Sequence, residues 1–127
     1  PEPAGRILTR MAADEALGQP VTEASFLILL ALAERPMHGY LIMQTINAVF
    51  RAGFKMGPGT LYRTLQLQMR DGLIRELESD GHATEDARRR LYAITSRGRA
   101  VARREMERLR TLHGLARARM GQAQADA

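Results

Sequence analysis

Cysteine and tryptophan are both absent from this 127-residue chain, and its aromatic side chains are limited to three Tyr and three Phe. Without cysteine the chain forms no disulfide, no thiolate metal site and no thiol nucleophile. With so few aromatic residues, its core must be aliphatic, and such a composition favours helices. These absences exclude cysteine-based enzymes and redox sensors, and they predict a mainly helical domain.

Long apolar runs are also lacking. The longest run, residues 26–33, is far shorter than the roughly 20 residues that a membrane span requires. The start of the chain does not resemble a signal peptide, because the acidic Glu2 and broken hydrophobicity follow it. We therefore expect a soluble, cytoplasmic protein with no membrane partner. The length suits one domain with accessory elements.

Lysine is scarce too, since Lys55 is the single lysine among 19 basic residues. The net charge of +5 and the pI near 10.6 create a positive field that attracts polyanions. Nucleic acid is the most common such partner, although an acidic protein or a membrane surface fits the charge as well. Arginine offers forked donors that suit phosphates and guanine edges. The charge thus favours nucleic acid without establishing it.

The hydrophobic pattern divides the chain into four parts. Residues 1–20 form an N-terminal helical arm, 21–95 a winged helix-turn-helix domain, 96–120 a long C-terminal helix and 121–127 a flexible tail. Thr22 caps a core helix that Pro36 stops. His38 and Gly39 open a third helix, for which the spacing predicts this buried stripe: Tyr40, Ile42 or Met43, Ile46, Ala48, Val49 and Phe50.

The most informative stretch is residues 57–92. Gly57 caps a helix with Pro58 at its first position, and Leu61, Leu65 and Met69 are expected to face the core before Gly72 ends it. Two alternating strands follow, joined by a polar turn, and Arg88, Arg89 and Arg90 open the second. A helix followed by a basic hairpin is typical of a winged helix-turn-helix. The predicted fold is mainly α with a small β-hairpin.

Three runs carry a resemblance to a known family: LILLALAERPMHGY, GPGTLYRTLQLQMRDGLI and RRRLYAITSRGR. In these runs the chain resembles short members of the PadR family of bacterial transcriptional regulators, over residues 22–99. The resemblance implies a homodimer that represses transcription and is released by a small effector. A two-fold dimer would place its recognition helices about 34 Å apart and would bind an inverted repeat in double-stranded DNA.

The chain departs from the family pattern in its recognition helix. Members of the family commonly read LKRLEEDGLI there, whereas this chain has the polar Gln68 where a buried Leu is usual and Leu67 where a basic side chain is usual. Either the helix rotates slightly to bury Leu67 or Met69, or Gln68 finds an internal hydrogen-bond partner. With less positive charge on the helix, phosphate binding shifts toward Arg63, Arg70 and the wing.

The expected DNA contacts divide into two sets. Phosphate contacts give affinity without sequence preference, whereas contacts to base edges give specificity. Arg63, Thr64 and Gln66 are the candidates for base edges. The expected backbone contacts are Lys55, Thr60, Tyr62, Arg70, Arg88, Arg89 and the hairpin tip near His82. In the alternative reading, Tyr62 is a core aromatic and the arginines are solvated surface charges or guard an edge strand.

Dimerisation is expected along the C-terminal helix, which is longer than a domain of this size needs as a cover. The predicted seam comprises Ile7, Leu8, Met11, Val101, Met106, Leu109, Leu112, Ala116 and Met120. If the family analogy holds, Met11, Phe26, Met106 and Leu109 line a cavity for a small hydrophobic effector.

Other kinds of site are not indicated. His38, His82 and His113 lack a second ligand at metal spacing, no acid and base pair stands out, and the Gly57–Thr60 segment lacks the lysine of a nucleotide-binding loop. We expect no enzyme, no metal and no cofactor. Two alternatives to a DNA-binding regulator stay open: a helical protein-interaction module and a ligand-binding dimer without a role on DNA.

Overall fold

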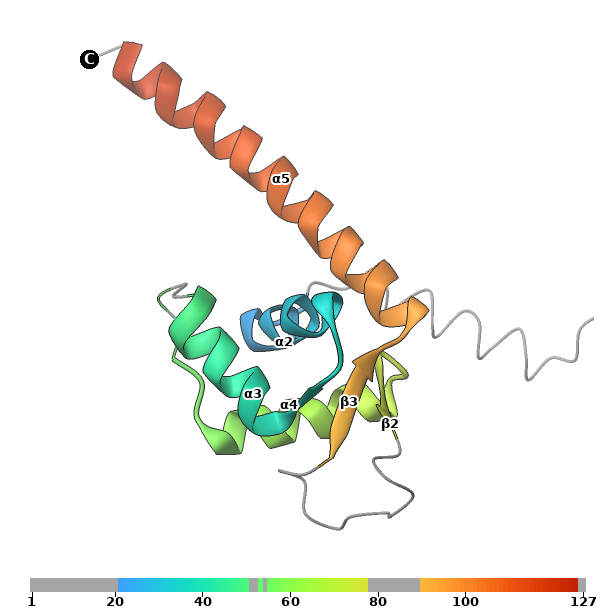
Figure 1. Ribbon diagram of the computed structural model, residues 1–127. Coiled ribbons are helices and arrows are strands. Elements are labelled where there is room, and N and C mark those ends of the chain that lie inside the picture. The colour runs from blue at the N-terminus through green and yellow to red at the C-terminus, as the bar shows by residue number, and fades with distance from the viewer. Residues whose placement is uncertain (1–20, 51–52, 54, 78–89, 126–127) are drawn as a thin grey trace, which may run out of the picture. The chain divides into compact units, whose positions relative to one another are not determined.

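The computed structural model describes residues 21–50, 53, 55–77 and 90–125 (Figure 1). The chain divides into two compact units, which are treated separately: residues 21–102 form one, and residues 103–125 are the described part of the other. Predictions for the N-terminal arm, for the hairpin tip and for Arg88 and Arg89 lie outside the described residues. The described elements are mainly helical and include a small antiparallel sheet, so the predicted fold class is confirmed.

Helix α2 (Glu23–Glu34) is the centre of the first unit. Thr22 caps it as predicted, because its hydroxyl accepts a hydrogen bond from the Ser25 amide at 3.1 Å. Its apolar side chains are distributed around much of the helix, and six of them are buried: Ala24, Leu27, Ile28, Leu29, Ala31 and Leu32. The helix ends two residues before Pro36, where the backbone becomes extended at Arg35.

The next segment differs from the prediction at its start. Met37 and His38 form a short strand, β1 (Met37–His38), and α3 (Gly39–Gln44) begins one residue later than expected. Tyr40 was predicted to be buried but is 57% exposed. It precedes the buried Ile42 by two positions, which is about 200° around a helix. Tyr40 therefore lies on the opposite face of α3 from the core.

The end of this segment departs from α-helical geometry. After α3 the chain continues as a π-helix, η1 (Thr45–Phe50), in which the hydrogen bonds span five residues instead of four. Ile46 is buried as predicted, whereas Ala48 and Val49 are exposed. The prediction for those two residues was wrong because the 3.6-residue period on which it rested does not apply to a π-helix.

Helix α4 (Pro58–Arg70) begins as the sequence predicts, with Gly57 as its cap and Pro58 at the first position. Its buried side chains are Leu61, Leu65 and Gln68. Met69, expected in the core, is 38% exposed. The helix ends at Gly72, whose φ of +74° is a left-handed conformation that suits glycine.

The sheet has three strands in the order β1-β3-β2, all antiparallel. Strands β2 (Ile74–Leu77) and β3 (Leu91–Ile94) pair with Ile74 opposite Ile94, as the hairpin prediction requires. Strand β1 adds to the other edge of β3, with Met37 opposite Tyr92. The predicted hairpin is thus part of a three-stranded sheet, in which residue 37 pairs with residue 92.

Helix α5 (Ser96–Ala125) follows β3 directly. Thr95 caps it, since its hydroxyl accepts from the Gly98 amide at 3.0 Å and donates to the Gly72 carbonyl at 2.6 Å. The helix extends five residues past its predicted end, so residues 121–125 are helical and do not form a tail. No described helix is long and apolar enough to cross a membrane.

Candidate nucleic-acid interface

The exposed face of α4 carries the side chains that could meet a groove. With about 100° between successive residues, Arg63, Gln66 and Arg70 lie opposite the buried Leu61 and Leu65, and all three are exposed. The helix contains no acidic residue. The predicted base-edge candidates Arg63 and Gln66 therefore share one open, positively charged surface.

Arg70 is 70% exposed and pairs with the neighbouring Asp71, with 3.2 Å between Nε and Oδ1. A salt bridge this exposed contributes about 1 kcal/mol at most. It therefore leaves the guanidinium able to exchange its partner for a phosphate.

Two threonines lie at the side of this surface. Thr64 is half-buried, and its hydroxyl donates to the Thr60 carbonyl at 2.7 Å, while Thr60 itself is exposed. The Thr64 oxygen keeps lone pairs that can accept a further hydrogen bond. The structure thus limits Thr64 to accepting, for example from the amino group of a base.

Two hydrogen bonds hold the backbone just before α4 in place. Asn47 in η1 donates from Nδ2 to the Met56 carbonyl and accepts from the Met56 amide at Oδ1, both at 2.8 Å. We call this pair the Asn47–Met56 clasp. It holds the residue between the exposed Lys55 and the cap Gly57, so Lys55 lies beside the start of α4.

Tyr62 is half-buried and connects α4 to α3. A Cβ atom built on Gly39 would lie 3.0 Å from Cε1 and 3.2 Å from the hydroxyl of Tyr62, so the ring packs directly on the Gly39 backbone. The absence of a side chain at Gly39 is what allows this approach. Tyr62 is thus a packing residue, as in the alternative reading, and its contact with DNA stays a prediction.

The base of the wing carries a small charged group around Tyr92. Arg90 and Glu76 form an ion pair across β3 and β2, with 3.7 Å between Nε and Oε1. Burial raises the pKa of Tyr92, the Arg90 charge opposes this shift, and Glu76 and Tyr62 add to it.

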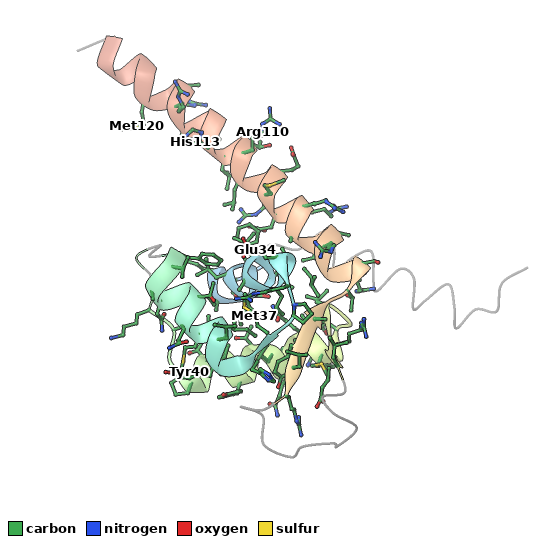
Figure 2. The ribbon with its side chains drawn as sticks, viewed as in Figure 1. Glu34, Met37, Tyr40, Arg110, His113 and Met120 are labelled. Atoms are coloured by element: carbon green, nitrogen blue, oxygen red, sulfur yellow. The ribbon has the colours of Figure 1, made fainter. Side chains whose placement is uncertain are left out.

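The predicted seam residues in the described part of the chain behave in two ways. Val101 is 5% exposed and contributes to the core of this chain, so its assignment to a dimer seam was wrong. The others are exposed: Met106, Leu109, Leu112, Ala116 and Met120. Figure 2 shows Met120 and His113 projecting from α5. An apolar stripe exposed to this degree on one helix is typical of an interface.

The proposed effector residues are not brought together by any described contact. Phe26 is half-buried in the first unit, Met106 and Leu109 are exposed on α5, and Met11 lies outside the described residues. Within the described residues there is also no group of three or more His, Asp or Glu side chains that could hold a metal ion.

Sequence reasoning missed two side-chain pairs, one in each unit. Tyr40 is exposed on α3 and its hydroxyl accepts from Gln44 Nε2 at 3.1 Å (Figure 2). Glu105 on α5 is 5% exposed and receives a bidentate interaction from Arg108, which raises the pKa of that guanidinium. The four-residue and three-residue spacings of these pairs are too common in helices to have indicated them from the sequence.

Comparison with known proteins decides the family. A profile of the transcriptional regulator PadR-like family matches residues 28–104, which include the second half of α2, the sheet, α4 and the start of α5. The chain belongs to the PadR-like family. This membership confirms the resemblance carried by the three sequence runs.

Two proteins similar to this PadR-like chain are known by sequence. Transcriptional regulator Rv3488 of Mycobacterium tuberculosis is 36% identical over 94 residues, which cover 74% of this chain and 79% of that protein. An uncharacterised 37.1 kDa protein in transposon TN4556 of Streptomyces fradiae is 37% identical over 92 residues. The match covers 72% of this chain but only 24% of the transposon protein.

Solved structures agree in fold. A PadR family transcription regulator from Clostridium difficile aligns with a TM-score of 0.66 at 21% identity, covering 78% of this chain and 99% of that one. At such identity the comparison shows the fold alone. The PadR-like family consists of transcriptional regulators that bind DNA and not of enzymes, so this chain is assigned to DNA-binding regulation.

Proposed function

We propose that this PadR-like chain is a homodimeric repressor that recognises an inverted repeat in double-stranded DNA. One observation carries the proposal: α4 presents Arg63, Gln66 and Arg70 on an exposed face without acidic residues, opposite the side chains that it buries. Such a helix can enter the major groove while its other face stays on the core. As a regulator of chromosomal genes, the protein would act in the cytoplasm.

The side chains take two roles in this proposal. Arg63 and Gln66 reach base edges, as a donor fork to guanine and a bidentate amide to adenine, and Thr64 accepts from an amino group. The remaining contacts go to phosphates: Lys55, Thr60, Tyr62, Arg70, Arg88 and Arg89. Phosphate contacts set the position of the helix, and base contacts select the sequence.

The dimeric part of the proposal rests on α5. Its exposed Met106, Leu109 and Met120 recur at helical spacing, and a second copy of the same helix would remove them from water. A two-fold dimer presents two α4 helices to half-sites separated by about one turn of DNA, about 34 Å. The inverted repeat of the operator follows from that symmetry.

Release by a small apolar effector completes the proposal. The family resemblance and the apolar side chains of Met11, Phe26, Met106 and Leu109 support it. An effector of this kind would act by changing the separation of the two half-site contacts. Isothermal titration of the protein–DNA complex with small apolar compounds tests this step, and binding that leaves DNA affinity unchanged would contradict it.

DNA binding itself is tested by fluorescence anisotropy. Wild-type protein is used to select duplexes from a random pool, and its affinity is then compared for the selected duplex and a shuffled duplex. We expect a palindromic selected sequence and an affinity that falls about a thousandfold between about 50 and 200 mM salt. Failure to bind any duplex at low salt would reject the proposal in favour of the protein-interaction module or the ligand-binding dimer.

A further inference from the structure

Gln68 is a polar residue in the buried stripe of α4. It is 2% exposed, and its Nε2 donates to the Ser25 carbonyl at 3.0 Å and to the Ser25 hydroxyl at 2.9 Å. A carbonyl oxygen can only accept, so the amide nitrogen must face it. The contact joins α4 to α2 across 43 positions of the sequence. Of the two alternatives raised by the sequence, the internal partner is the one observed.

The apolar side chains of α4 offer two ways of placing the helix on α2. The observed one buries Leu61, Leu65 and Gln68, whereas Met69 is 38% exposed. Burying Met69 in place of Gln68 would rotate α4 by about 30°, given the roughly 100° between successive residues. The rotated placement would move apolar surface out of water.

The observed placement also leaves Gln68 Oε1 buried without a hydrogen bond among the described residues. An unsatisfied buried oxygen is unfavourable. Hydrophobicity and polar satisfaction therefore both favour the rotated helix, whereas the bonds to Ser25 and the packing of Tyr62 on Gly39 oppose it. We infer that the Gln68–Ser25 contact sets the rotation of α4, and that Gln68 is a positioning residue for DNA recognition.

The consequence for DNA rests on the proposed function. A side chain at the outer radius of a helix, about 5–6 Å from the axis, moves by about 3 Å in a rotation of about 30°. A hydrogen bond to a base edge does not survive such a displacement, whereas a long arginine can still reach a phosphate. Loss of the contact should therefore reduce discrimination between sequences more than it reduces general affinity.

Rotation can be measured without DNA, because the chain contains no cysteine. Thr64 is half-buried on the opposite side of the stripe from Met69, so a rotation that buries Met69 exposes residue 64. In the full chain carrying Thr64→Cys, Gln68→Glu replaces the amide with a carboxyl group of nearly the same size, which has no donor once it is ionised. We expect the thiol to react with a maleimide about tenfold faster than with Gln68 present.

Matched variants separate rotation from other effects. Gln68→Leu restores an apolar side chain in the same position and should return the reaction rate to that of the chain with Gln68. A thiol at the buried Ala31 of α2 reports unfolding and should stay protected in every variant. If Gln68→Glu does not fold, Gln68→Ala takes its place, with the same expected increase. An unchanged rate at residue 64 in a folded variant would overturn the inference.

The same Gln68 variants in the natural chain are then compared on the selected and the shuffled duplex. We expect Gln68→Glu to lower the ratio of the two affinities about tenfold while general affinity changes little, and Gln68→Leu to keep the ratio. An unchanged ratio in a variant whose helix has rotated would overturn the positioning role. Failure of the wild-type protein to select any sequence would reject the proposed function, and the thiol result would stand independently.

Discussion

Gly98 lies where the first turn of α5 meets the chain entering β2. A Cβ atom at this position would collide with the Leu73 carbonyl and would come within 2.8 Å of Ile94 Cγ1. We expect Gly98→Ala to lower the free energy of unfolding by about 2 kcal/mol, as over-packing of a core does. Urea denaturation followed by circular dichroism measures the change.

Gly114 provides the matched control for this substitution. It lies on the same helix and a Cβ atom there has no neighbour within 4 Å. Gly114→Ala should therefore stabilise the chain by about 0.5–1 kcal/mol, because alanine restricts the unfolded chain and favours the helix. A Gly98→Ala variant as stable as the natural chain would contradict this prediction, because the backbone at Leu73 would then have moved to make room for the new methyl group.

Tyr92 should make the stability of the folded chain depend on pH in the alkaline range. Burial raises the pKa of its phenol above 10.0, its ordinary value, so the folded state holds this proton more tightly than the unfolded state. The contribution of Tyr92 to the free energy of unfolding is fully present below about pH 10. It is lost as the pH rises through the pKa of Tyr92 in the folded state. Denaturation curves measured from about pH 9 to about pH 11 should show that the free energy of unfolding declines, and that it declines less in Tyr92→Phe. Equal declines in both proteins would contradict this role for Tyr92.

Gln68 marks the limit of prediction at the scale of single residues. The spacing from Leu61 and Leu65 places residue 68 on the buried stripe, but a glutamine there gives no sign of burial, because its apolar neighbours Leu67 and Met69 are better candidates for a core. Its partner Ser25 is 43 positions away. Which of three adjacent side chains is buried was therefore decided by a tertiary hydrogen bond, which helical periodicity does not contain.

Among the elements, those with signals inside their own sequence were predicted well. Thr22 and Gly57 cap α2 and α4 as predicted, because a cap depends on residues within one turn. Strand β1 was missed since two residues carry no alternation and pair only with the distant β3. The π-helix η1 was missed because its widened turn is not encoded in the apolar pattern of residues 45–50.

DNA recognition by α4 can be tested by changing the Arg63 side chain, first in shape and then in charge. Arg63→Lys keeps the charge but loses the forked donors, so we expect affinity for the selected duplex to fall about tenfold while the salt dependence persists. Arg63→Ala should reduce specific binding at least as much as Arg63→Lys does. Anisotropy on the selected and shuffled duplexes measures both, and equal losses on the two DNAs would argue against base contact by Arg63.

For the whole molecule, the central prediction is the assembly of two chains through α5. Leu109→Arg places a charge in the exposed apolar stripe, and we expect it to convert dimers to monomers because an unpaired charge is costly to bury. Light scattering coupled to size-exclusion chromatography reports the mass. Weaker binding to the inverted repeat should accompany the loss of the dimer.

Leu115→Arg is the control for the same charge on the same helix. Leu115 is 54% exposed but lies about 120° around the helix from Leu109, outside the predicted seam. The mass of this variant should remain that of a dimer. A monomer from Leu115→Arg, or a dimer from Leu109→Arg, would place the seam elsewhere. The sequence indicated the stripe, but a surface that requires a second chain is not defined by the fold of one.

The Asn47–Met56 clasp has a consequence for how the chain tolerates change. Because Asn47 grips the backbone of Met56 at both its amide and its carbonyl, the start of α4 is positioned from η1 directly. These hydrogen bonds do not depend on the number of residues between Asn47 and Met56. An insertion between residues 50 and 55, such as a short peptide tag, should therefore leave the recognition helix in place, which offers a site for labelling the protein.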